Sequence, residues 1–386
     1  MDVHTHRKKI LFTSSWFPSK SNGSLGNFVQ RHAEAVMLKN DVHVLYVTAQ
    51  ADLKETFLLE NSKENGIEIT RVYFKPNRWW NPLRKMRAFQ KGVKHLLEGR
   101  HLRFDLVHHN VLWKDGWQPY LLNRKYKLPY IITEHWTGFD QQARGKASWS
   151  LQLLCRLFAS RAAVICPVTE NLAGNMKALG IKGKYRVVPN VVDTSLFGMH
   201  PKPLRPTRFL HVSSLDDKQK NISGILKVWK KVTEKDASLH LSIGGDGSWK
   251  PYQQLIEELN IPSSSITFFG EKSWSGIAEL MKESHCLLMF SNYENLPCVI
   301  VEALASGMHI ISTHVGGIAE HINETRGILI APNDSNALES AILQYTHQFQ
   351  DAPREALRDY AEKQFSIPSI AQAFDDIYNA VLNSND

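Results

Sequence analysis

The chain has 386 residues, a length typical of two domains of ordinary size. Apolar residues make up 43% and charged residues 22%, which excludes a disordered chain and a fibrous repeat, and no apolar run reaches the about 18 residues that span a bilayer. The net charge of +8 is unevenly distributed. Residues 1–200 contain 30 Lys and Arg against 15 Asp and Glu, whereas residues 201–386 contain 16 against 23. The first half is therefore expected to face an anionic partner.

Short β-rich runs alternate with helical patterns along the chain. In the first half the predicted strands are 9–13, 42–48, 67–74, 106–109, 130–133, 163–168 and 185–188. In the second half they are 208–212, 239–243, 266–269, 286–290, 309–312 and 327–330. Predicted helices lie at 27–38, 223–231, 249–259, 297–306, 336–348 and 366–383. This alternation predicts an α/β fold, with parallel sheets that helices cover on both faces.

A proline-rich segment separates the two sets of elements. Residues 200–206 contain three prolines and predict a stiff linker. We therefore expect two Rossmann-like, doubly wound domains, residues 1–200 and residues 201–365. Ligands of such sheets bind at the carboxyl ends of the strands, so the expected site is the cleft between the two domains.

Residues 71–103 are strongly basic, with ten Lys or Arg and one acid. Apolar residues recur there at helical spacing, and a basic amphipathic helix suits an anionic membrane surface. The alternatives are an ordinary surface helix with a solvated cationic face and, with less support, a nucleic-acid site, although no nucleic-acid motif accompanies the charge. We expect no nucleic-acid partner, and we assign five residues to an acceptor or membrane side: Trp79, Trp80, Arg84, Lys85 and Arg87.

The strongest chemical signal runs from Ser291 to Gly307. Pro297 and Gly307 suit the start and the end of a helix. Because that helix is apolar all round, the carboxylate of Glu302 needs a hydrogen-bonded partner or a polar ligand. Glu294 lies just before it, where backbone amides suit a phosphate and a carboxylate suits hydroxyl groups. The structural alternative is that Glu294 caps the helix and Glu302 pairs with a buried base.

This segment resembles the signature of retaining glycosyltransferases of family 4, which have the GT-B fold: Glu294, seven residues, Glu302 and then Ala-Leu-Ala-Ser-Gly307. The resemblance covers nearly the whole chain, and further segments are similar in order and spacing: Val188–Asp193, Ile243–Gly247, Val315–Glu320 and Gly327–Asp334. It implies two Rossmann-like domains that face each other across a cleft. It also implies that the C-terminal helix 366–386 crosses back onto the first domain.

The resemblance implies a nucleoside-diphosphate sugar as donor, with a UDP-sugar favoured, held mainly by the second domain. Glu294 would accept hydrogen bonds from sugar hydroxyls, and Glu302 would hold the ribose. Gly245 lies in the family's glycine turn, and amides around Asn295 and Leu296 would contact the sugar and the diphosphate. The family often has glycine at the position of Asn295, so this residue is expected to alter sugar preference.

The departing diphosphate needs positive charge. A fixed donor at a developing anion is typically worth about 10²–10³ in rate. By resemblance the candidate is Lys220, after strand 208–212, with Lys218 as a rival because the alignment can slip by two residues. The family commonly carries an Arg–Lys pair here, and Ser214 stands at the apparent Arg position, so the Arg role is missing or supplied elsewhere. The plain alternative for Lys220 is a solvated loop lysine.

In the first half, the turn after the first strand is rich in glycine and leads to Gly26, which matches the family's glycine at this helix start. Such a turn lets backbone amides approach a phosphate, although a plain loop with a helix cap fits equally well. His135 follows strand 130–133 and matches a family histidine that contacts the donor sugar. His108 and His109 end another strand and are acceptor-side candidates.

No His, Asp or Glu set has metal-ligand spacing, and the four cysteines form no CxxC pair. We therefore predict no metal and no cofactor besides the nucleotide-sugar substrate. The cysteine usage fits a reduced, cytoplasmic protein, peripheral at the inner face of the membrane if the basic helix binds lipid.

The resemblance implies a retaining, hexosyltransferase-type enzyme that transfers sugar to a glycan or lipid-linked acceptor in cell-surface polysaccharide synthesis. An inactive nucleotide-sugar-binding protein remains an alternative, because Ser214 and Asn295 depart from the family pattern. An NAD-dependent oxidoreductase is opposed by the missing GxGxxG motif. A retaining phosphorylase is a lesser alternative.

Overall fold

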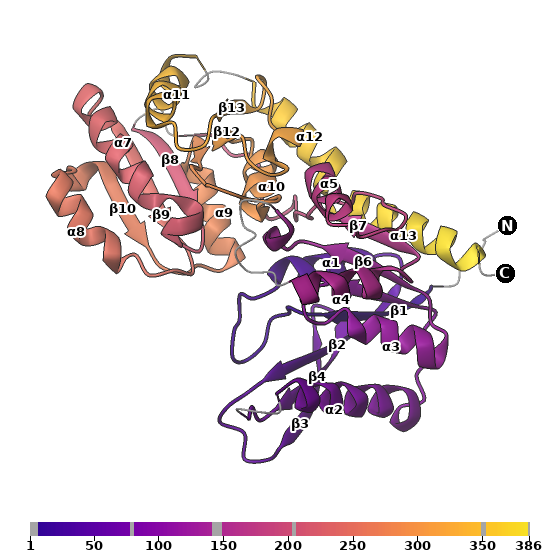
Figure 1. The fold of residues 1–386 in the computed structure, drawn as a ribbon. Coiled ribbons are helices and arrows are strands. Elements are labelled where there is room, and N and C mark those ends of the chain that lie inside the picture. Colours follow the sequence, from indigo (N-terminus) through magenta and orange to yellow (C-terminus); the bar gives the residue numbers. More distant parts are fainter. Residues whose placement is uncertain (1–6, 78–80, 141–148, 203–205, 349–352, 385–386) are drawn as a thin grey trace. The chain divides into compact units, whose positions relative to one another are not determined.

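The internal contacts of the chain divide it into two units (Figure 1). The first unit contains the residues up to Pro189 together with Ile367–Asp386, and the second contains Asn190–Ser366. The computed structural model describes residues 7–77, 81–140, 149–202, 206–348 and 353–384. Each unit is described by itself below.

The boundary lies at Pro189, before the proline-rich segment at which the sequence analysis divides the chain. The reason is that residues after Pro189 already pack on the second unit. Asn190 Nδ2 donates to the carbonyl of Leu296 at 2.6 Å, and the amide of Val192 donates to the carbonyl of Phe365 at 2.8 Å. Residues 203–205 of the proline-rich segment lie outside the described residues.

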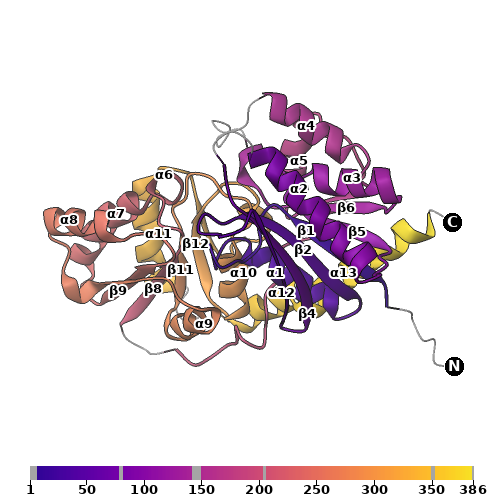
Figure 2. The same ribbon diagram turned by 90° about the horizontal axis from the view of Figure 1, so that it is seen from below.

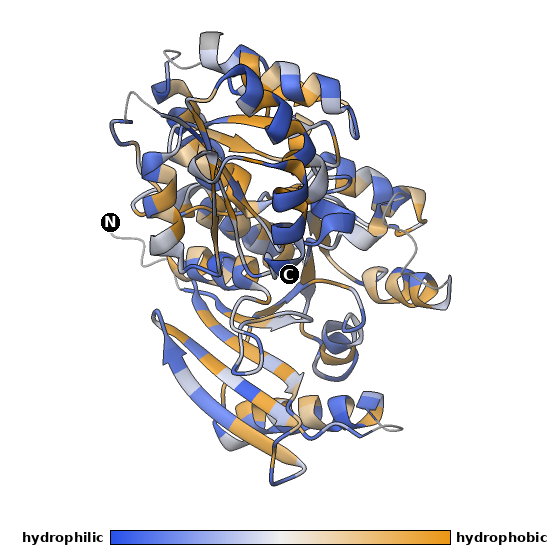
Figure 3. Ribbon diagram, turned by 90° about the vertical axis from the view of Figure 1, so that its left-hand side faces the viewer, coloured by the Kyte–Doolittle hydropathy of each residue, from blue (hydrophilic) through white to orange (hydrophobic). Residues whose placement is uncertain are grey.

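The first unit is built on a sheet with the strand order β3-β4-β2-β1-β5-β6-β7. Its strands are β1 (Lys9–Ser14), β2 (Asp41–Ala49), β3 (Phe57–Glu64), β4 (Ile67–Phe74), β5 (Leu106–Asn110), β6 (Tyr130–Glu134) and β7 (Val164–Pro167). All neighbours pair in parallel except β3 and β4. The central strands are buried on both faces, as is usual for parallel strands between two layers of helices. Figure 3, coloured by hydropathy, shows hydrophobic residues concentrated in strands that lie between helices.

Helices cover both faces of this sheet. They are α1 (Asn27–Met37), α2 (Asn81–Lys94), α3 (Trp117–Tyr126), α4 (Trp149–Ala159), α5 (Glu170–Ala178) and α13 (Ile367–Asn383), with a π-helical turn, η1 (His95–Gly99), and a 3₁₀ turn, η2 (Thr137–Phe139). Figures 1 and 2 show α2, α3 and α4 on one side of the sheet and α1 and α13 on the other. The C-terminal helix therefore belongs to the first unit, where Asp375 bonds with Lys8 at 2.9 Å.

The second unit has a parallel sheet with the order β10-β9-β8-β11-β12-β13. Its strands are β8 (Thr207–Val212), β9 (Leu239–Gly244), β10 (Ile266–Phe269), β11 (Cys286–Leu288), β12 (His309–Thr313) and β13 (Gly327–Ile330). Its helices are α6 (Asp217–Lys220), α7 (Ile222–Lys235), α8 (Lys250–Leu259), α9 (Trp274–Glu283), α10 (Cys298–Ala305), α11 (Ser335–Gln348) and α12 (Glu355–Phe365), with 3₁₀ turns η4 (Ser263–Ser265) and η5 (Ile318–Glu320). The prediction of two Rossmann-like, doubly wound sheets is confirmed.

Two strands differ from the sequence prediction. Strand β3 was not predicted, because its second half is polar and exposed. It joins β4 through Asn65 and Gly66, both with positive φ (47° and 86°), which is the two-residue hairpin turn that Asn-Gly favours. The predicted strand 185–188 is wrong, since only Tyr185 forms a bridge, to Ile165. The amides of Arg186 and Val188 still donate to the carbonyls of Ile165 and Pro167, at 3.0 and 3.1 Å, but Pro167 has no N–H to donate in return, so no regular ladder forms.

Candidate active site

The two central strands of the second sheet, β8 and β11, define its switch point. The chain goes from β8 toward β9 on one side, and from β11 toward β12 on the other. The loops that follow the two strands meet at the carboxyl edge of the sheet, and this switch point is where doubly wound sheets bind ligands. The loop after β8 carries Lys220, and the loop after β11 carries Glu294.

Lys220 and Glu294 form an ion pair across this switch point, between Lys220 Nζ and Glu294 Oε1. Both side chains are almost fully buried, with 11% and 5% of their surface exposed. A buried pair is costly to break, because removing one partner leaves the other charge without compensation. The rival candidate, Lys218, has an exposed side chain. The geometry therefore favours Lys220 over Lys218 as the cation at the switch point.

Further hydrogen bonds tie the two loops together. The amide of Asn292 donates to the carbonyl of Gln219 at 2.8 Å, and its side-chain nitrogen donates to the carbonyl of Lys218 at 3.0 Å. Gln219 Nε2 in turn lies 3.3 Å from both the Tyr293 carbonyl and Glu294 Oε2. The carboxylate of Glu294 is thus contacted by a cation and by an amide, both from the short helix α6.

The alternative in which Glu294 caps the following helix is wrong. Helix α10 begins at Cys298 with Pro297 as its N-cap, and no side chain caps it. Pro297 precedes the helix rather than forming its first residue, and Gly307 follows the end of α10 with φ of 64°. Glu302 lies within α10 and is 6% exposed. The start of α10 follows directly on the segment that carries Glu294, and the first amides of a helix have no partner from a preceding turn.

The segment between Glu294 and Pro297 is held from two sides. The carbonyl of Asn295 accepts from the amide of Gly317 at 3.1 Å, and the carbonyl of Leu296 accepts from Asn190. Gly316 has φ of 55°, and a Cβ there would lie 1.9 Å from the carbonyl oxygen of Glu294. Only glycine permits this close approach, so the turn after β12 fixes the backbone that carries the carboxylate.

The glycine turn after β9 packs against the loop after β8. Gly245 has φ of 144°, and a Cβ there would meet the carbonyl oxygen of Ser213 at 1.7 Å. A Cβ on Gly247 would meet the carbonyl oxygen of Ser214 at 1.9 Å. The side chain of Ser214 is exposed, and its backbone rather than its hydroxyl makes the contact with the turn.

In the first unit the candidate residues gather at the equivalent edge. Gly26 precedes α1 and lies against the backbone of Trp16. The ring of His135 lies after β6 and stacks near two side chains of α1, 4.3 Å from the ring of Phe28 and 5.2 Å from that of His32. His135 and the start of α1 therefore meet at one place in this unit.

The turn that carries His135 is organised by Glu134, which is fully buried. One carboxylate oxygen accepts from the amides of His135 and Trp136, both at 2.8 Å, and the other accepts from the amide of Leu112 at 2.8 Å. Burial raises the pKa of Glu134 to about 7, against the effect of the three amides. The carboxyl group thus joins the loops after β5 and β6.

The acceptor-side interpretation of His108 and His109 is wrong. Both rings are fully buried, and His108 is bonded to Thr133 and Tyr378 at 2.6 and 2.7 Å. His109 is bonded to Thr13 at 2.8 Å. Burial lowers the pKa of His109 to about 3 and that of His108 well below its usual value. These histidines are neutral parts of the core.

The residues assigned to an acceptor or membrane side lie on or before α2. Trp79 and Trp80 fall outside the described residues. Arg84 donates to the carbonyl of Lys75 at 2.7 Å, and Arg87 is exposed. Lys85 instead forms an ion pair at 2.5 Å with Asp115, whose side chain is 2% exposed, so its charge is directed into the unit.

Sequence reasoning missed three residues that contact the segment from Glu294 to Leu296: Gln219, Asn190 and Gly316. Asn190 and Gly316 lie in segments that the family resemblance already includes, so that resemblance was the available signal. Gln219 had none, because its role depends on the approach of the β11 loop, which a single sequence does not reveal.

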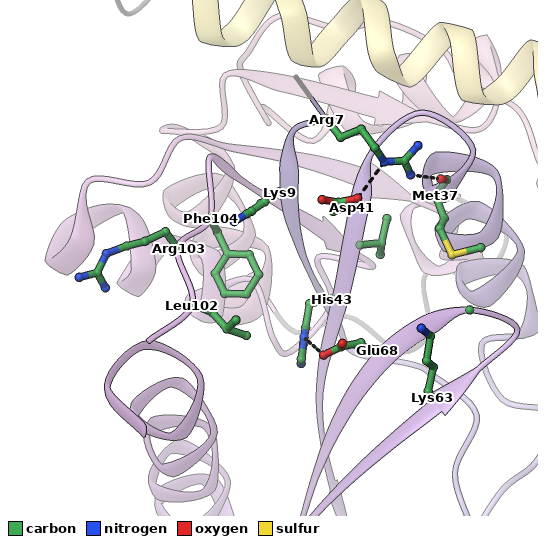
Figure 4. Close-up of a pocket in the computed structure, with 12 residues that line it drawn as sticks. Arg7, Lys9, Met37, Asp41, His43, Lys63, Glu68, Leu102, Arg103 and Phe104 are labelled. Carbon is green, nitrogen blue, oxygen red and sulfur yellow. Dashed lines mark hydrogen bonds and ion pairs between the residues drawn. The ribbon is translucent and has the colours of Figure 1, made fainter. Parts of the chain in front are cut away.

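The carboxyl edges of the sheets are distinct from the cavity drawn in Figure 4. That cavity, of about 420 Å³, lies where β1 and β2 begin and is lined by Asp41, His43 and Glu68 among others. Its acids are already paired, Asp41 with Arg7 at 2.8 Å and Glu68 with Arg100 at 2.9 Å. Within the described ranges, no group of three or more His, Cys, Asp or Glu is placed to hold a metal ion. The helices of the same ranges include none with the length and hydropathy of a membrane span.

Comparisons with known proteins cover both units. The family described as Glycosyltransferase Family 4 matches residues 26–196, and the family described as Glycosyl transferases group 1 matches residues 193–364. The chain is 23% identical over 406 aligned positions to the putative teichuronic acid biosynthesis glycosyltransferase TuaC of Bacillus subtilis (strain 168), covering 98% of this chain and 100% of that protein.

Solved structures share the whole fold. Sucrose-phosphate synthase from Thermosynechococcus elongatus matches with a TM-score of 0.78 at 18% identity, covering 98% of this chain and 100% of that one. HepE of Anabaena, in complex with UDP and glucose, matches with a TM-score of 0.75 at 16% identity, covering 97% and 100%. At these identities the likeness establishes the fold.

Proposed function

The chain belongs to the glycosyltransferases of family 4 and group 1, which have the GT-B fold, and we propose that it transfers a sugar from a nucleoside-diphosphate sugar to an acceptor with retention of configuration. The observation that carries this proposal is the buried Lys220–Glu294 pair at the switch point of the second sheet. A sugar diphosphate offers a partner to each of these groups.

The ion pair explains how a ligand of this class would bind. A phosphate oxygen is an alternative partner for the ammonium of Lys220, and a sugar hydroxyl is an alternative partner for the carboxylate of Glu294. A ligand with only one of these groups would leave the other charge buried and uncompensated. The arrangement therefore favours a ligand that carries an anion and hydroxyl groups close together.

In the reaction that we propose, the acceptor hydroxyl attacks the anomeric carbon on the face from which the diphosphate leaves. The bond between that carbon and the phosphate oxygen breaks, and the electron pair stays on the diphosphate. The acceptor proton passes to the same diphosphate oxygen. Lys220 and the amides at the start of α10 would stabilise the charge that develops there. Ser214 supplies no second cation, so we assign the stabilisation to these groups.

The acceptor and the donor base are proposed by analogy. The printed name of TuaC places that protein in teichuronic acid biosynthesis, and HepE was solved with UDP and glucose. We accordingly propose a UDP-sugar donor, a hexosyl-type transfer and a glycan or lipid-linked acceptor in cell-surface polysaccharide synthesis. Asn295 beside Glu294 would contribute to the choice of sugar.

Transfer of radiolabelled sugar from a panel of UDP-sugars to a membrane glycolipid fraction tests the proposal. We expect product formation that persists in EDTA, because Lys220 and helix amides take the role of a metal. Binding without turnover for every donor would instead favour the inactive binding protein. Loss of turnover in EDTA, restored by a divalent cation, would contradict the metal-independent mechanism. The oxidoreductase alternative is not favoured by the family assignment.

A further inference from the structure

Most of the exposed large apolar side chains of the first unit lie on two helices, α2 and α4. Among the described residues, seven large hydrophobic side chains are exposed, and six of them lie on α2 or α4. Those on α4 are Trp149, Leu153, Leu154 and Leu157, with 77%, 52%, 43% and 47% of their surface exposed, and those on α2 are Leu83 and Met86. Trp149, Leu153 and Leu157 are spaced by four residues, so they share one face of α4.

The helices on this side of the sheet carry only positive charge. Helices α2, α3 and α4 together contain eight Lys or Arg and no Asp or Glu. On the opposite side, α1 and α13 contain one Arg and three acids. Figures 1 and 2 both show α2, α3 and α4 side by side on one side of the sheet. This side therefore combines positive charge with exposed apolar side chains.

Several of the cations on this side are available to an external partner. Arg87, Lys91 and Lys94 on α2 are exposed, and so are Arg124 and Lys125 on α3. Between the two helices, a groove of about 320 Å³ is lined by apolar side chains, by Lys94 and Lys125, and by Glu98, which lies 3.9 Å from Lys94 Nζ in an exposed ion pair. Of the basic residues that the sequence analysis singled out on α2, only Arg87 belongs to this exposed set.

The topology places the apolar residues at the edge that carries the candidate site. Helices α2 and α4 each connect parallel strands of the sheet, so each begins near the carboxyl ends of the strands. Leu83, Met86, Trp149 and Leu153 lie in the first halves of these helices.

We propose that the α2–α3–α4 side of the first unit docks on an anionic membrane surface, with Trp149, Leu153 and Leu157 of α4 inserted among the lipid headgroups. Charge complementarity selects this occupant over a neutral protein surface, because α2 and α3 on the same side carry the exposed cations and no acid on the three helices opposes an anionic lipid. Such docking would bring the carboxyl edge of the sheet to the place where a lipid-linked acceptor resides. The docking itself does not depend on the proposed reaction.

Sedimentation with vesicles tests the proposal on the full chain. We expect binding to vesicles of phosphatidylcholine with phosphatidylglycerol, weak binding to phosphatidylcholine alone, and weaker binding in high salt. The triple variant Trp149→Ser/Leu153→Ser/Leu157→Ser should bind the anionic vesicles roughly tenfold less tightly. Arg87→Ser/Lys91→Ser/Lys94→Ser should lose the preference for the anionic lipid.

The matched control is Leu38→Ser, which removes an equally exposed apolar side chain next to α1. This variant should bind vesicles as the wild type does, and the melting temperatures of all variants should agree, since every altered side chain is exposed. Wild-type protein that binds neither vesicle, or a triple variant that binds as tightly as the wild type, would overturn the proposal. A triple variant that changes a dimer into a monomer in light scattering, while its vesicle binding persists, would identify the face as a contact between copies instead.

Discussion

The two units share one strand order and differ in what stands at the switch point. If the extra hairpin strand β3 is set aside, both sheets follow the same order, with the first strand beside the fourth. In the second unit the loops at this point carry the buried pair of Lys220 and Glu294. In the first unit the equivalent strands β1 and β5 are joined by neutral groups, such as Thr13 bonded to His109.

This difference shows that topology supplies a position while the loop residues supply the chemistry. In the second unit the position is occupied by two charges that are paired with each other, and the proposed function requires a ligand to separate them. In the first unit the same position is closed by core hydrogen bonds, and the candidate residue His135 lies after the next strand, β6. The variants below test this division of roles.

The largest expected effect is on transfer by Lys220→Ala. Loss of a fixed cation at the departing diphosphate should reduce turnover by about 10²–10³. The matched control is Lys218→Ala, which removes a lysine from the same short helix but with an exposed side chain. Steady-state rates of sugar transfer check the pair. Equal rates for the two variants would show that the buried position has no special role.

The next effect is on stability, through Glu294→Ala. Removing one partner of a buried ion pair should lower the free energy of unfolding by about 3 kcal/mol, because Lys220 is left uncompensated. The double variant Lys220→Ala/Glu294→Ala should lose less than the sum of the two single variants. Denaturant titration of the four proteins measures this coupling. Additive losses would mean that the two side chains do not depend on each other.

A smaller effect is expected from Gly316→Ala. The added Cβ would clash with the Glu294 carbonyl in a backbone of positive φ, which should cost about 2 kcal/mol and also lower activity. Gly270→Ala is the control, since a Cβ there meets no atom within 4 Å. Thermal unfolding and transfer rates compare the two. A neutral Gly316→Ala variant would contradict the close approach of these loops.

The neutral buried histidines of the first unit should make its free energy of unfolding depend on pH. Burial lowers the pKa of His43 from 6.5 to about 4, so the unfolded chain binds its proton first as the pH falls. The contribution of this group is fully present above pH 6.5 and is lost as the pH falls toward 4. His43→Gln should therefore reduce the slope of unfolding free energy against pH in this window by up to about 1.4 kcal/mol per pH unit. An unchanged slope would mean that His43 titrates alike in both states.

Much of the fold was predictable because parallel strands are buried on both faces and their apolar runs are continuous. Strand β3 lacks such a run, and the Asn65–Gly66 turn was the signal that could have revealed it. Helix α4 was not predicted, and its exposed Trp and Leu residues do not follow the usual pattern of a surface helix.

The residues of the candidate site were predictable, but the contacts between them were less so. The positions of Glu294 and Lys220 followed from the family resemblance. Their pairing did not, because it depends on β8 and β11 being neighbours in the sheet although they are far apart in sequence. For the same reason a single sequence could not show that Lys85 is neutralised by Asp115 or that His108 is buried.

A thermal-shift titration with a panel of nucleoside-diphosphate sugars tests the central claim most directly, with wild type, Lys220→Ala and Lys218→Ala compared side by side. A ligand at 100 times its dissociation constant stabilises a protein by about 2.7 kcal/mol, which is readily measured. We predict that at least one nucleotide sugar stabilises the wild type and Lys218→Ala, and that the same sugar stabilises Lys220→Ala far less. Equal stabilisation of all three proteins, or of none by any sugar in the panel, would contradict the account.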